Sequence, residues 1–421
     1  MLHVYRALAN LILFFSPIII FIRLLKKREH PTRFKEKFGF YTKKRLQGKL
    51  IWFHGASVGE ILSIIPLIEK LEKNKKINQI LITSNTLSSS KILLNFRLKK
   101  TIHQFFPIDT NYHTQKFLNY WKPSNAIFID SEIWPNMITN IKKKPISLIL
   151  INARITDKSF KKWKIFSSYA KTVFQKFDLC LSSSLKSRRY LKILGAKKIR
   201  YIGNLKFTES EKFADDLANN LRKFLLSKKI WCASSTHDTE EKICALVHKK
   251  LKNKYKNLLT IIIPRHIHRA KKIESEIKKL DLKIHIHNSK KKINKKTDIY
   301  LVNSFGQTRS FFKICKTVFL GGSLISHGGQ NPLEAARYGC KILHGPNIWN
   351  FKEIYALLER HKVSNKILNM NQLTTNVNRM FNSKNETKNL ELKIKRLGNK
   401  ILNSTLNEIN FYIKKNEIKK T

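Results

Sequence analysis

The chain has 421 residues, and its 83 Lys and Arg against 28 Asp and Glu give a formal net charge of +55. This length predicts two or three domains, and a hydrophobic content of 42% excludes a wholly disordered or collagen-like chain. The five cysteines are scattered without a C-x-x-C pair, which argues against a disulfide framework or a zinc ribbon and fits a reducing compartment.

The strong positive charge has three explanations. The excess is mostly lysine spread over the whole chain, and solvated lysine-rich faces account for much of it without any partner. An anionic membrane surface is the favoured partner, because the N-terminal sequence supports it. We expect no nucleic-acid partner, since the sequence shows no basic motif interleaved with aromatic residues and no known nucleic-acid module.

Residues 7–22 form an uncharged apolar run with Arg6 before it and Arg23 after it. A helix of roughly 16–19 residues reaches about 24–28 Å, and snorkelling of the two arginines closes the gap to a hydrocarbon core of roughly 30 Å. A basic cluster at 26–37 follows, so the positive-inside rule keeps the rest of the chain cytoplasmic. We predict one membrane anchor over residues 1–25. A signal peptide is disfavoured, because no A-x-A-like cleavage site is present, and a helix lying in the interface stays open.

Beyond residue 49, short runs rich in Ile and Leu alternate with segments long enough for helices. The first series of these expected strands lies at 50–54, 79–84, 126–130, 146–152 and 178–183. The second series lies at 230–235, 259–264, 283–288, 298–303, 317–322 and 340–345. Such βα alternation predicts parallel sheets covered on both faces, in an α/β fold of two doubly wound Rossmann-like domains with a cleft between them. We place these domains at 26–205 and 206–421, the second with terminal helices.

The first junction between a strand and a helix reads IWFHGASVGE (51–60). Ligands of open α/β sheets bind beyond the carboxyl ends of the strands, so Glu60 in the first turn of the next helix is a candidate catalytic carboxylate. The alternative is a capped helix whose glutamate complements the helix dipole. No G-K-[ST] follows, which excludes a P-loop, and Ser57 lacks evident His and Asp partners in the order of a hydrolase.

The strand at 126–130 leads into FIDSEIWPN (128–136). Asp130 and Glu132 are spaced like the metal-binding D-x-D of many nucleotide-sugar enzymes. A turn with solvated acidic residues is the alternative, because Trp134-Pro135 ends the strand.

Strand ends in the second domain carry candidate contacts to an anion. ASSTHDTEE (233–241) suits a helix N-terminus that binds phosphate. IIIPRHIHR (261–269) places Arg265 directly after a strand, where its guanidinium can bind a phosphate with two hydrogen bonds. Its histidines are interpreted as polar loop residues rather than metal ligands.

LGGSLISHGGQNPLEAARYG (320–339) is the most informative string of the second domain. Its paired glycines let the backbone approach a ligand closely. Asn331-Pro332 starts a helix with Glu334 in its first turn, where the carboxylate can accept hydrogen bonds from a ribose diol or complement the helix dipole.

Together these strings resemble those of the bacterial 3-deoxy-D-manno-octulosonic acid (Kdo) transferases, which build the inner core of lipopolysaccharide. The matching strings occur in order over nearly the whole chain: FKEKFGFY (34–41), HGASVGE (54–60), DSEIWPN (130–136), LINARITDKSFKKW (150–163), GNLKF (203–207), SSTHDTEE (234–241), PRH (264–266), GGSLISHGGQNPLEAARYG (321–339) and GPNIWNFKEI (345–354). The resemblance implies a GT-B fold and an inverting glycosyltransferase. Its N-terminal domain would bind a lipid A precursor (lipid IVA), and its C-terminal domain would bind CMP-Kdo.

The resemblance also implies roles for individual residues. Glu60 takes the place of the general base, and Glu132 and Lys206 match positions that stabilise the transition state. The CMP-binding segments correspond to Pro264, Arg265, Phe305, Gly306, Gln307, Asn331, Pro332, Leu333 and Glu334. One departure concerns VNSFGQ (302–307), where the family usually shows a string like G-D-T-M-G-E. Asn303 and Gln307 replace two acidic residues there, which affects the side-chain part of the nucleotide contact.

Inverting glycosyl transfer needs one carboxylate to take the proton of the attacking hydroxyl, and Glu60 fits that task. No metal is then required, so we expect a metal-independent enzyme without a cofactor. The expected partners are CMP-Kdo, a lipid A precursor and an anionic membrane surface, and the expected location is the cytoplasmic side of the inner membrane. The alternatives are a GT-B transferase using another nucleotide sugar, such as a UDP-sugar, and a membrane-tethered binding protein with decayed catalytic residues.

Overall fold

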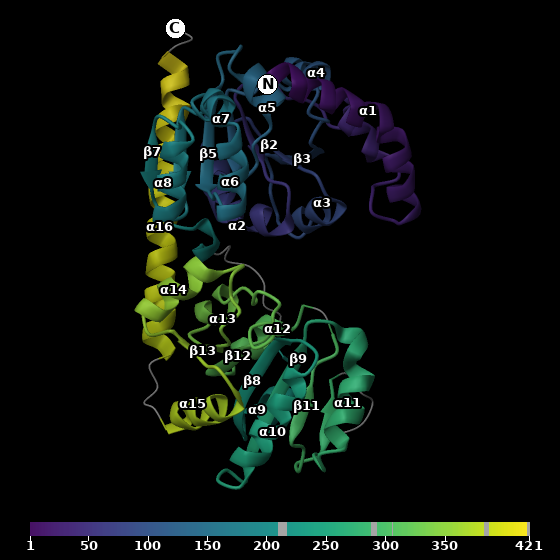
Figure 1. Cartoon of the computed structure of the whole chain (residues 1–421), viewed down its shortest axis with the longest axis vertical. Helices are drawn as coiled ribbons and strands as arrows, with labels where there is room; N and C mark the ends of the chain where they lie inside the picture. The colour runs from purple at the N-terminus through teal and green to yellow at the C-terminus, as the bar shows by residue number, and fades with distance from the viewer. Residues whose placement is uncertain (209–216, 288–292, 305, 383–386, 419–421) are drawn as a thin grey trace. The chain divides into compact units, whose positions relative to one another are not determined.

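The computed structural model describes residues 1–208, 217–287, 293–304, 306–382 and 387–418. The chain forms two compact units, coloured from purple to yellow along the chain in Figure 1. Unit 1 comprises Met1–Glu211 and Gly398–Thr421, and unit 2 comprises Lys212–Leu397.

Unit 1 is built on a seven-stranded parallel sheet in the order β3-β2-β1-β4-β5-β6-β7. Its strands are β1 (Leu50–His54), β2 (Gln79–Ser84), β3 (Thr101–Phe105), β4 (Asn125–Ile129), β5 (Ser147–Ala153), β6 (Leu179–Ser182) and β7 (Ile199–Tyr201). β1 pairs with both β2 and β4, so the direction in which strands are added reverses at β1. Ligands of doubly wound sheets bind at this reversal, beyond the carboxyl ends of the strands.

Several helices of unit 1 start where the local sequence supplies a capping hydroxyl. They are α1 (Leu2–Leu25), the 3₁₀ turn η1 (Arg33–Phe38), α2 (Val58–Glu72), α3 (Leu87–Leu93), α4 (Asn111–Trp121), α5 (Pro135–Ile141), α6 (Asp157–Ile165), α7 (Ser167–Phe174), α8 (Leu185–Ile193), the 3₁₀ turn η2 (Leu205–Phe207) and most of α16 (Thr387–Ile418). The N-cap hydroxyls that accept a backbone N–H three residues later belong to Ser57, Thr86, Thr110, Thr156 and Ser184. Most of these hydroxyls follow a strand closely, so each helix begins near a strand end.

The core of unit 1 lies on both faces of its sheet. β1, β2 and β4 are buried along their whole length, which is typical of a parallel sheet covered by helices. On one face Trp52 packs against the rings of Phe117 and Phe128, with centroids 4.8 and 5.2 Å away. This rigid core fixes the strand ends on which the candidate site stands.

Unit 2 repeats the architecture, with the sheet order β10-β11-β9-β8-β12-β13-β14. Its strands are β8 (Lys229–Thr236), β9 (Leu258–Pro264), β10 (Ile284–Ile286), β11 (Ile299–Leu301), β12 (Thr317–Leu320), β13 (Lys341–His344) and β14 (Ser364–Lys366). Its helices are α9 (Asn219–Leu226), α10 (Glu240–Lys252), η3 (Ile267–Arg269), α11 (Ala270–Lys278), α12 (Thr308–Phe312), α13 (Leu333–Arg337), α14 (Lys352–Arg360) and α15 (Met370–Asn382). Here the reversal lies at β8, which pairs with β9 and β12.

The predicted α/β fold with two doubly wound parallel sheets is confirmed, and every run predicted as a strand forms one. The strands β3, β7 and β14 were not predicted. Their sequences TIHQF, IRY and SNK are short or polar, and they lie at or next to the sheet edges, where a strand buries less of its surface.

The structure divides the chain differently from the predicted boundaries at its C-terminal end. The residues from Gly398 onward pack on unit 1, whereas the sequence division placed them in the second domain. Tyr412 shows the reason, because its hydroxyl donates to the carbonyl of Asp178 (2.9 Å) and its own carbonyl accepts from the side chain of Asn125 (3.3 Å). Gly398 passes so close to Phe207 that an added Cβ would lie 2.5 Å from the Phe207 carbonyl oxygen.

Among the described residues, α1 is the one helix that is long and apolar enough to cross a membrane. It has 24 residues, its most apolar window has a mean hydropathy of 2.3, and 11% of that window is buried. The predicted apolar segment is therefore a single continuous helix.

We expect Ile409→Ala to lower the free energy of unfolding by about 2–5 kcal/mol, because Ile409 is fully buried. Phe411→Ala in the same helix is the matched control, since Phe411 is 55% exposed, and its effect should stay within about 0.5 kcal/mol. Urea unfolding followed by tryptophan fluorescence measures both. Equal effects of the two substitutions would show that the terminal helix does not pack on unit 1.

Candidate functional site

Glu60 lies in the first turn of α2, beyond the carboxyl end of β1. Its Oε2 accepts the backbone N–H of Ala56 (2.7 Å) and its Oε1 accepts the hydroxyl of Ser57 (2.8 Å). The Ser57 oxygen in turn accepts the backbone N–H of Glu60 (3.3 Å). This pair is a variant of the capping box, in which the glutamate reaches the N–H of the residue before the N-cap, so the capped-helix interpretation describes the geometry correctly. The same cap holds the carboxylate at the carboxyl end of β1, where the strand order reverses and where doubly wound sheets bind their ligands.

The carboxyl group of Glu60 is tuned by its surroundings. Burial raises the pKa of Glu60 above its ordinary value, and the negative charges of Glu132 and Asp130 raise it further. The hydrogen bonds from Ser57 and Ala56 act in the opposite direction. A carboxylate with a raised pKa takes up a proton more readily near neutral pH, which suits a general base.

Glu132 follows β4 and is fixed by two aromatic side chains. Its Oε2 accepts the indole N–H of Trp134 (2.9 Å) and lies 3.3 Å from Nε2 of His54. The hydroxyl of Thr83 accepts the indole N–H of Trp52 (2.9 Å) and lies 3.0 Å from Nδ1 of His54. Nδ1 also lies 3.3 Å from the backbone carbonyl of Thr83, so β2 holds one edge of the ring while Nε2 faces the Glu132 carboxylate.

Sequence reasoning assigned no role to His54. The residue is fully buried at the end of β1, and its ring stacks on Phe106 with centroids 3.8 Å apart. A histidine at the last position of an otherwise apolar strand, directly before the junction, was the available signal. We infer that His54 holds the Glu132 carboxylate in place beside Glu60.

Lys206 is brought to the same edge by two residues with left-handed backbone. Asp130 has φ 60° and Asn152 has φ 50°, a conformation that Asp and Asn tolerate better than most residues. Asn152 Oδ1 accepts the backbone N–H of Leu205 (2.9 Å), which fixes the turn carrying Lys206. Lys206 Nζ then lies 3.4 Å from Asp130 Oδ2. A cation therefore stands among carboxylates at this edge.

We call His54, Glu60, Asp130, Glu132 and Lys206 the edge cluster. Its carboxylates face different partners and do not converge on one point. Across the described ranges, no group of three or more His, Cys, Asp and Glu side chains is placed to hold a metal ion. The D-x-D spacing of Asp130 and Glu132 therefore serves hydrogen bonds and an ion pair in this structure.

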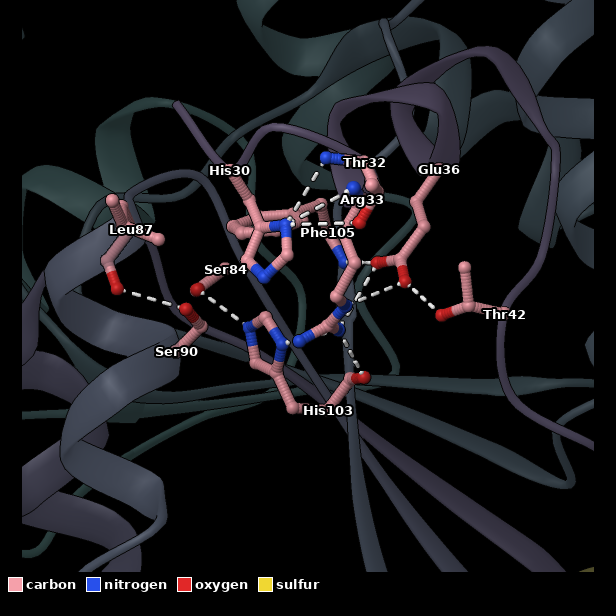
Figure 2. Close-up of polar contacts among 10 residues, drawn as sticks. All are labelled: His30, Thr32, Arg33, Glu36, Thr42, Ser84, Leu87, Ser90, His103 and Phe105. Carbon is pink, nitrogen blue, oxygen red and sulfur yellow. Dashed lines mark hydrogen bonds and ion pairs between the residues drawn. The ribbon is translucent and has the colours of Figure 1, made fainter. Parts of the chain in front are cut away.

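A separate polar network, shown in Figure 2, holds the string FKEKFGFY on the edge strand β3. The fully buried carboxylate of Glu36 accepts from the guanidinium of Arg33 (2.8 Å), the backbone N–H of Phe105 (2.8 Å) and the hydroxyl of Thr42. Arg33 also donates to the carbonyl of His103 (2.7 Å). Burial and the charge of Arg33 lower the pKa of His103 to about 3, so its ring stays neutral. This network is structural, because its groups satisfy one another.

In unit 2, the buried carboxylate of Glu240 binds the glycine-rich loop after β12. Its Oε2 accepts the backbone N–H of Gly322 (2.7 Å) and of His237 (3.0 Å). Its Oε1 accepts those of Ser323 (3.2 Å) and Leu324 (3.1 Å). The amides of this loop are thus satisfied within the protein, and the phosphate contact expected at this helix N-terminus stays a prediction.

Glycine is required at two positions of this loop, because nearby parts of unit 2 leave no room for a side chain. A Cβ on Gly321 would lie 2.5 Å from the Cα of Thr236, and one on Gly328 would lie 2.3 Å from the side-chain nitrogen of Asn350. Close packing inside unit 2 therefore explains these glycines without a ligand.

The predicted nucleotide contacts around Arg265 lie at exposed strand ends. Pro264 is buried at the end of β9, and the backbone N–H of the exposed Arg265 donates to the carbonyl of Thr236 (2.9 Å). Gly306 has φ 83°, and a Cβ there would meet no atom within 4 Å, so the backbone is open to a ligand. Gln307 follows as the N-cap of α12.

The string NPLE starts α13. Asn331 is exposed, and its side-chain oxygen accepts the backbone N–H of Leu333 (3.1 Å), whereas Pro332 and Leu333 are buried. Glu334 Oε1 accepts from Arg309 (3.2 Å), so a donor to this carboxylate is already in place. Asn331 and Glu334 are the members of this string whose side chains can reach a ligand.

The predicted nucleotide contacts follow the carboxyl ends of β9, β11 and β12, which lie close together in the sheet order. Phe305 lies outside the described residues. Asn303, one of the two amides that replace acids, has a buried side-chain oxygen with no hydrogen-bond partner in the part of the chain that the structure describes. The roles assigned to all these residues stay predictions.

A family model and several relatives carry the same family description. Residues 32–209 match the family model described as 3-Deoxy-D-manno-octulosonic-acid transferase (kdotransferase). The 3-deoxy-D-manno-octulosonic acid transferase of Rickettsia bellii is 33% identical to this chain over 96% of it and 98% of the relative. That of Haemophilus influenzae is 28% identical over 83% of this chain and 84% of the relative.

A solved structure extends the comparison to the fold. The UDP-GlcNAc 2-epimerase of Neisseria meningitidis has a TM-score of 0.58 at 13% identity and covers 87% of this chain and 100% of its own. With the two parallel seven-stranded sheets, this likeness confirms the GT-B type of architecture. The chain belongs to the 3-deoxy-D-manno-octulosonic acid (Kdo) transferase family and is a glycosyltransferase enzyme.

Proposed function

We propose that the protein transfers Kdo from CMP-Kdo to a lipid A precursor, with inversion at the anomeric carbon, in lipopolysaccharide core synthesis. The family supplies the sugar, and the resemblance of the motifs supplies the donor and the acceptor. The observation that carries the proposal is the half-buried Glu60 carboxylate, held by its capping box and raised in pKa beside Glu132. This is the group that a base-catalysed sugar transfer needs.

In the proposed reaction, Glu60 removes the proton of the acceptor hydroxyl as its oxygen bonds to the anomeric carbon. The bond between that carbon and the phosphate oxygen breaks, and its electron pair leaves with CMP. The carboxylate of Glu132, fixed by Trp134 and His54, stabilises the positive charge that develops on the sugar. Lys206 offsets negative charge near the same centre.

For the donor, the exposed guanidinium of Arg265 suits the phosphate of CMP. The backbone at Gly306 is open and offers its N–H to the phosphate. This contact does not need the acidic side chains that the family usually has at the positions of Asn303 and Gln307. Glu334, which already accepts from Arg309, suits the ribose hydroxyls. The leaving group is then met by a cation and by backbone dipoles, and no metal enters the proposal.

We also propose that the enzyme acts at the cytoplasmic face of the inner membrane. The apolar helix α1 is followed by exposed Lys26, Lys27 and Arg28, which favour the cytoplasmic side and anionic lipid. The proposed acceptor is itself an anionic lipid of that membrane. Attachment then raises the concentration of enzyme on the surface that holds the acceptor.

The direct test incubates purified protein with CMP-Kdo and tetraacylated lipid A precursor and counts the added sugars by mass. Competition with free CMP and free UDP separates this function from a transferase using a UDP-sugar. We expect CMP to inhibit and UDP not to. Inhibition by UDP alone would overturn the donor, and an absence of transfer from CMP-Kdo would favour a decayed binding protein.

Glu60→Gln should lower kcat on the order of 10²–10⁴-fold and leave CMP affinity unchanged, because the amide keeps the shape of the cap but accepts no proton. Single-turnover rates and CMP titration measure the two quantities. Glu276→Gln on the surface of unit 2 is the matched control and should be silent. Turnover close to that of the unchanged enzyme would remove Glu60 from the mechanism.

Glu132→Gln should move the acid limb of the kcat/KM profile to lower pH. The Glu132 charge raises the pKa of Glu60, so its removal lowers that pKa and Glu60 stays ionised further into acid. The rate on the plateau should also fall, because Glu132 is assigned to the transition state. An acid limb that stays in place or moves to higher pH contradicts the coupling between the two groups.

EDTA should leave the transfer rate unchanged when CMP-Kdo is supplied preformed. Asp130 pairs with Lys206, and Glu132 accepts from Trp134, so neither is presented as part of a ligand set. The assay compares initial rates with EDTA, with added Mg²⁺ and with neither. A rate that collapses in EDTA and returns with Mg²⁺ would restore the metal interpretation of the D-x-D spacing.

A further inference from the structure

The N-terminal end of α1 is fixed to unit 1 by polar side chains. The hydroxyl of Tyr5 donates to Asp109 Oδ2 (2.7 Å), and Arg6 donates to the side-chain oxygens of Asn136 (3.1 Å) and Asn111 (3.2 Å). In Figure 1 this end of α1 begins beside α4 and α5, the helices that carry Asn111 and Asn136. The first turns of α1 therefore belong to the surface of unit 1.

The acceptor of Tyr5 is a built feature of the unit. Asp109 is buried, and its carboxylate also accepts the backbone N–H of Asn136 (3.1 Å) and of Met137 (2.8 Å) at the start of α5. The Tyr5 hydroxyl adds a further donor to this buried charge. If α1 crossed a bilayer and carried Tyr5 to its far side, Asp109 would lose one of its hydrogen-bond donors.

The C-terminal end of α1 is fixed as well. Arg23 donates to the buried carboxylate of Glu29 (2.7 Å), which also pairs with Lys37 (2.6 Å). The following turn is held on β3 by the network of Arg33 and Glu36 in Figure 2. Both ends of the helix are thus attached to the same unit.

These attachments set the direction of the helix. Arg6 and Arg23 lie about 26 Å apart along its axis at 1.5 Å per residue. A helix that crossed the bilayer away from unit 1 would carry its first turns to the opposite leaflet, with Tyr5 and Arg6 far from their partners. Contacts at both ends require α1 to run along unit 1.

The two sides of α1 differ in character. Ala9, Ser16 and Ile20 are buried against the unit. The opposite side exposes an uncharged stripe at alternating spacings of four and three residues: Val4, Leu8, Leu11, Phe15, Ile18 and Ile22. Ile12, Phe14, Ile19, Phe21 and Leu25 are exposed beside this stripe, so most of the helix outside its contact with the unit is apolar, and exposed basic residues follow at 26–28. Exposed apolar surface of this extent suits the acyl region of a membrane.

We propose that α1 lies parallel to the bilayer surface, with this stripe in the acyl region of an anionic leaflet, and does not cross the membrane. The occupant of the stripe is lipid rather than protein, because the stripe carries no polar group for a specific partner and is followed by cations that suit anionic head groups. This proposal rests on the membrane attachment in the proposed function and specifies its geometry. It leaves both ends of α1 and both units on one side of the membrane.

The first experiment labels single cysteines with a membrane-impermeant maleimide, using full-length protein bound from outside to phosphatidylglycerol-rich vesicles. The native cysteines are all buried, so an exposed introduced cysteine is reported selectively. His3→Cys probes the start of α1, and Lys75→Cys on the exposed loop after α2 is the matched control. We expect both to label equally in intact and in permeabilised vesicles. Protection of His3→Cys to about a tenth of its permeabilised value, with Lys75→Cys unprotected, would show a spanning helix and overturn the proposal.

The second experiment measures the depth of spin labels at Val4, Leu11 and Ile18, which lie on the stripe seven residues apart. A helix parallel to the surface places all three at one shallow depth, about 5–10 Å below the head groups. A spanning helix separates neighbouring positions by about 10 Å, with Leu11 deepest. Three equal depths support the proposal, and a maximum at Leu11 overturns it, as does protein that fails to float with the vesicles.

Kdo transfer measured on the same vesicles keeps the two proposals separate. If the enzyme transfers Kdo while His3→Cys is protected, the proposed function stands and the parallel orientation of α1 is wrong. If both cysteines label equally but no Kdo is transferred from CMP-Kdo, the parallel orientation of α1 stands and the proposed function is wrong.

Discussion

The candidate site depends on the pairing of β1 with both β2 and β4. Because the strands are parallel, this pairing sets the carboxyl ends of β1 and β4 side by side, although long stretches of sequence separate them. Glu60 follows the first of these strands and Glu132 the second. Burial raises the pKa of Glu60, and the charge of Glu132 is close enough to raise it further.

Carboxylates gathered at a partly buried edge repel one another, and the surrounding residues offset this cost. Lys206 faces Asp130, while the indole of Trp134 donates to Glu132 and the His54 ring lies against the same carboxylate. Within the described part of the chain, the donors to Glu60 are the neutral N–H of Ala56 and hydroxyl of Ser57. Among the residues that the structure describes, the cluster thus pairs Asp130 with a cation and leaves Glu60 without one, which is a condition under which a carboxylate acts as a base near neutral pH.

Sequence reasoning located the strands that are continuous apolar runs, as buried parallel strands are, and it located the residues at their ends. It missed the edge strands β3, β7 and β14, whose sequences are short or polar, and the role of His54, which depends on contacts with Thr83 in β2 and Glu132 after β4. It also placed the terminal helix with the wrong partner, since an amphipathic pattern shows that a face is buried but not against which unit.

Contacts from distant parts of the chain also explain why two similar motifs serve different purposes. HGASVGE and STHDTEE each place a glutamate in the first turn of the helix after the first strand of a sheet, at the reversal of strand order. Glu240 is fully buried and is satisfied by backbone N–H groups of the loop after β12, so it stabilises the fold of unit 2. Glu60 is half-buried and lies beside like charges, so it remains available to a substrate. The position in the fold offers both residues as candidates, and the hydrogen bonds that reach each carboxylate from distant parts of the chain decide which one is free to react.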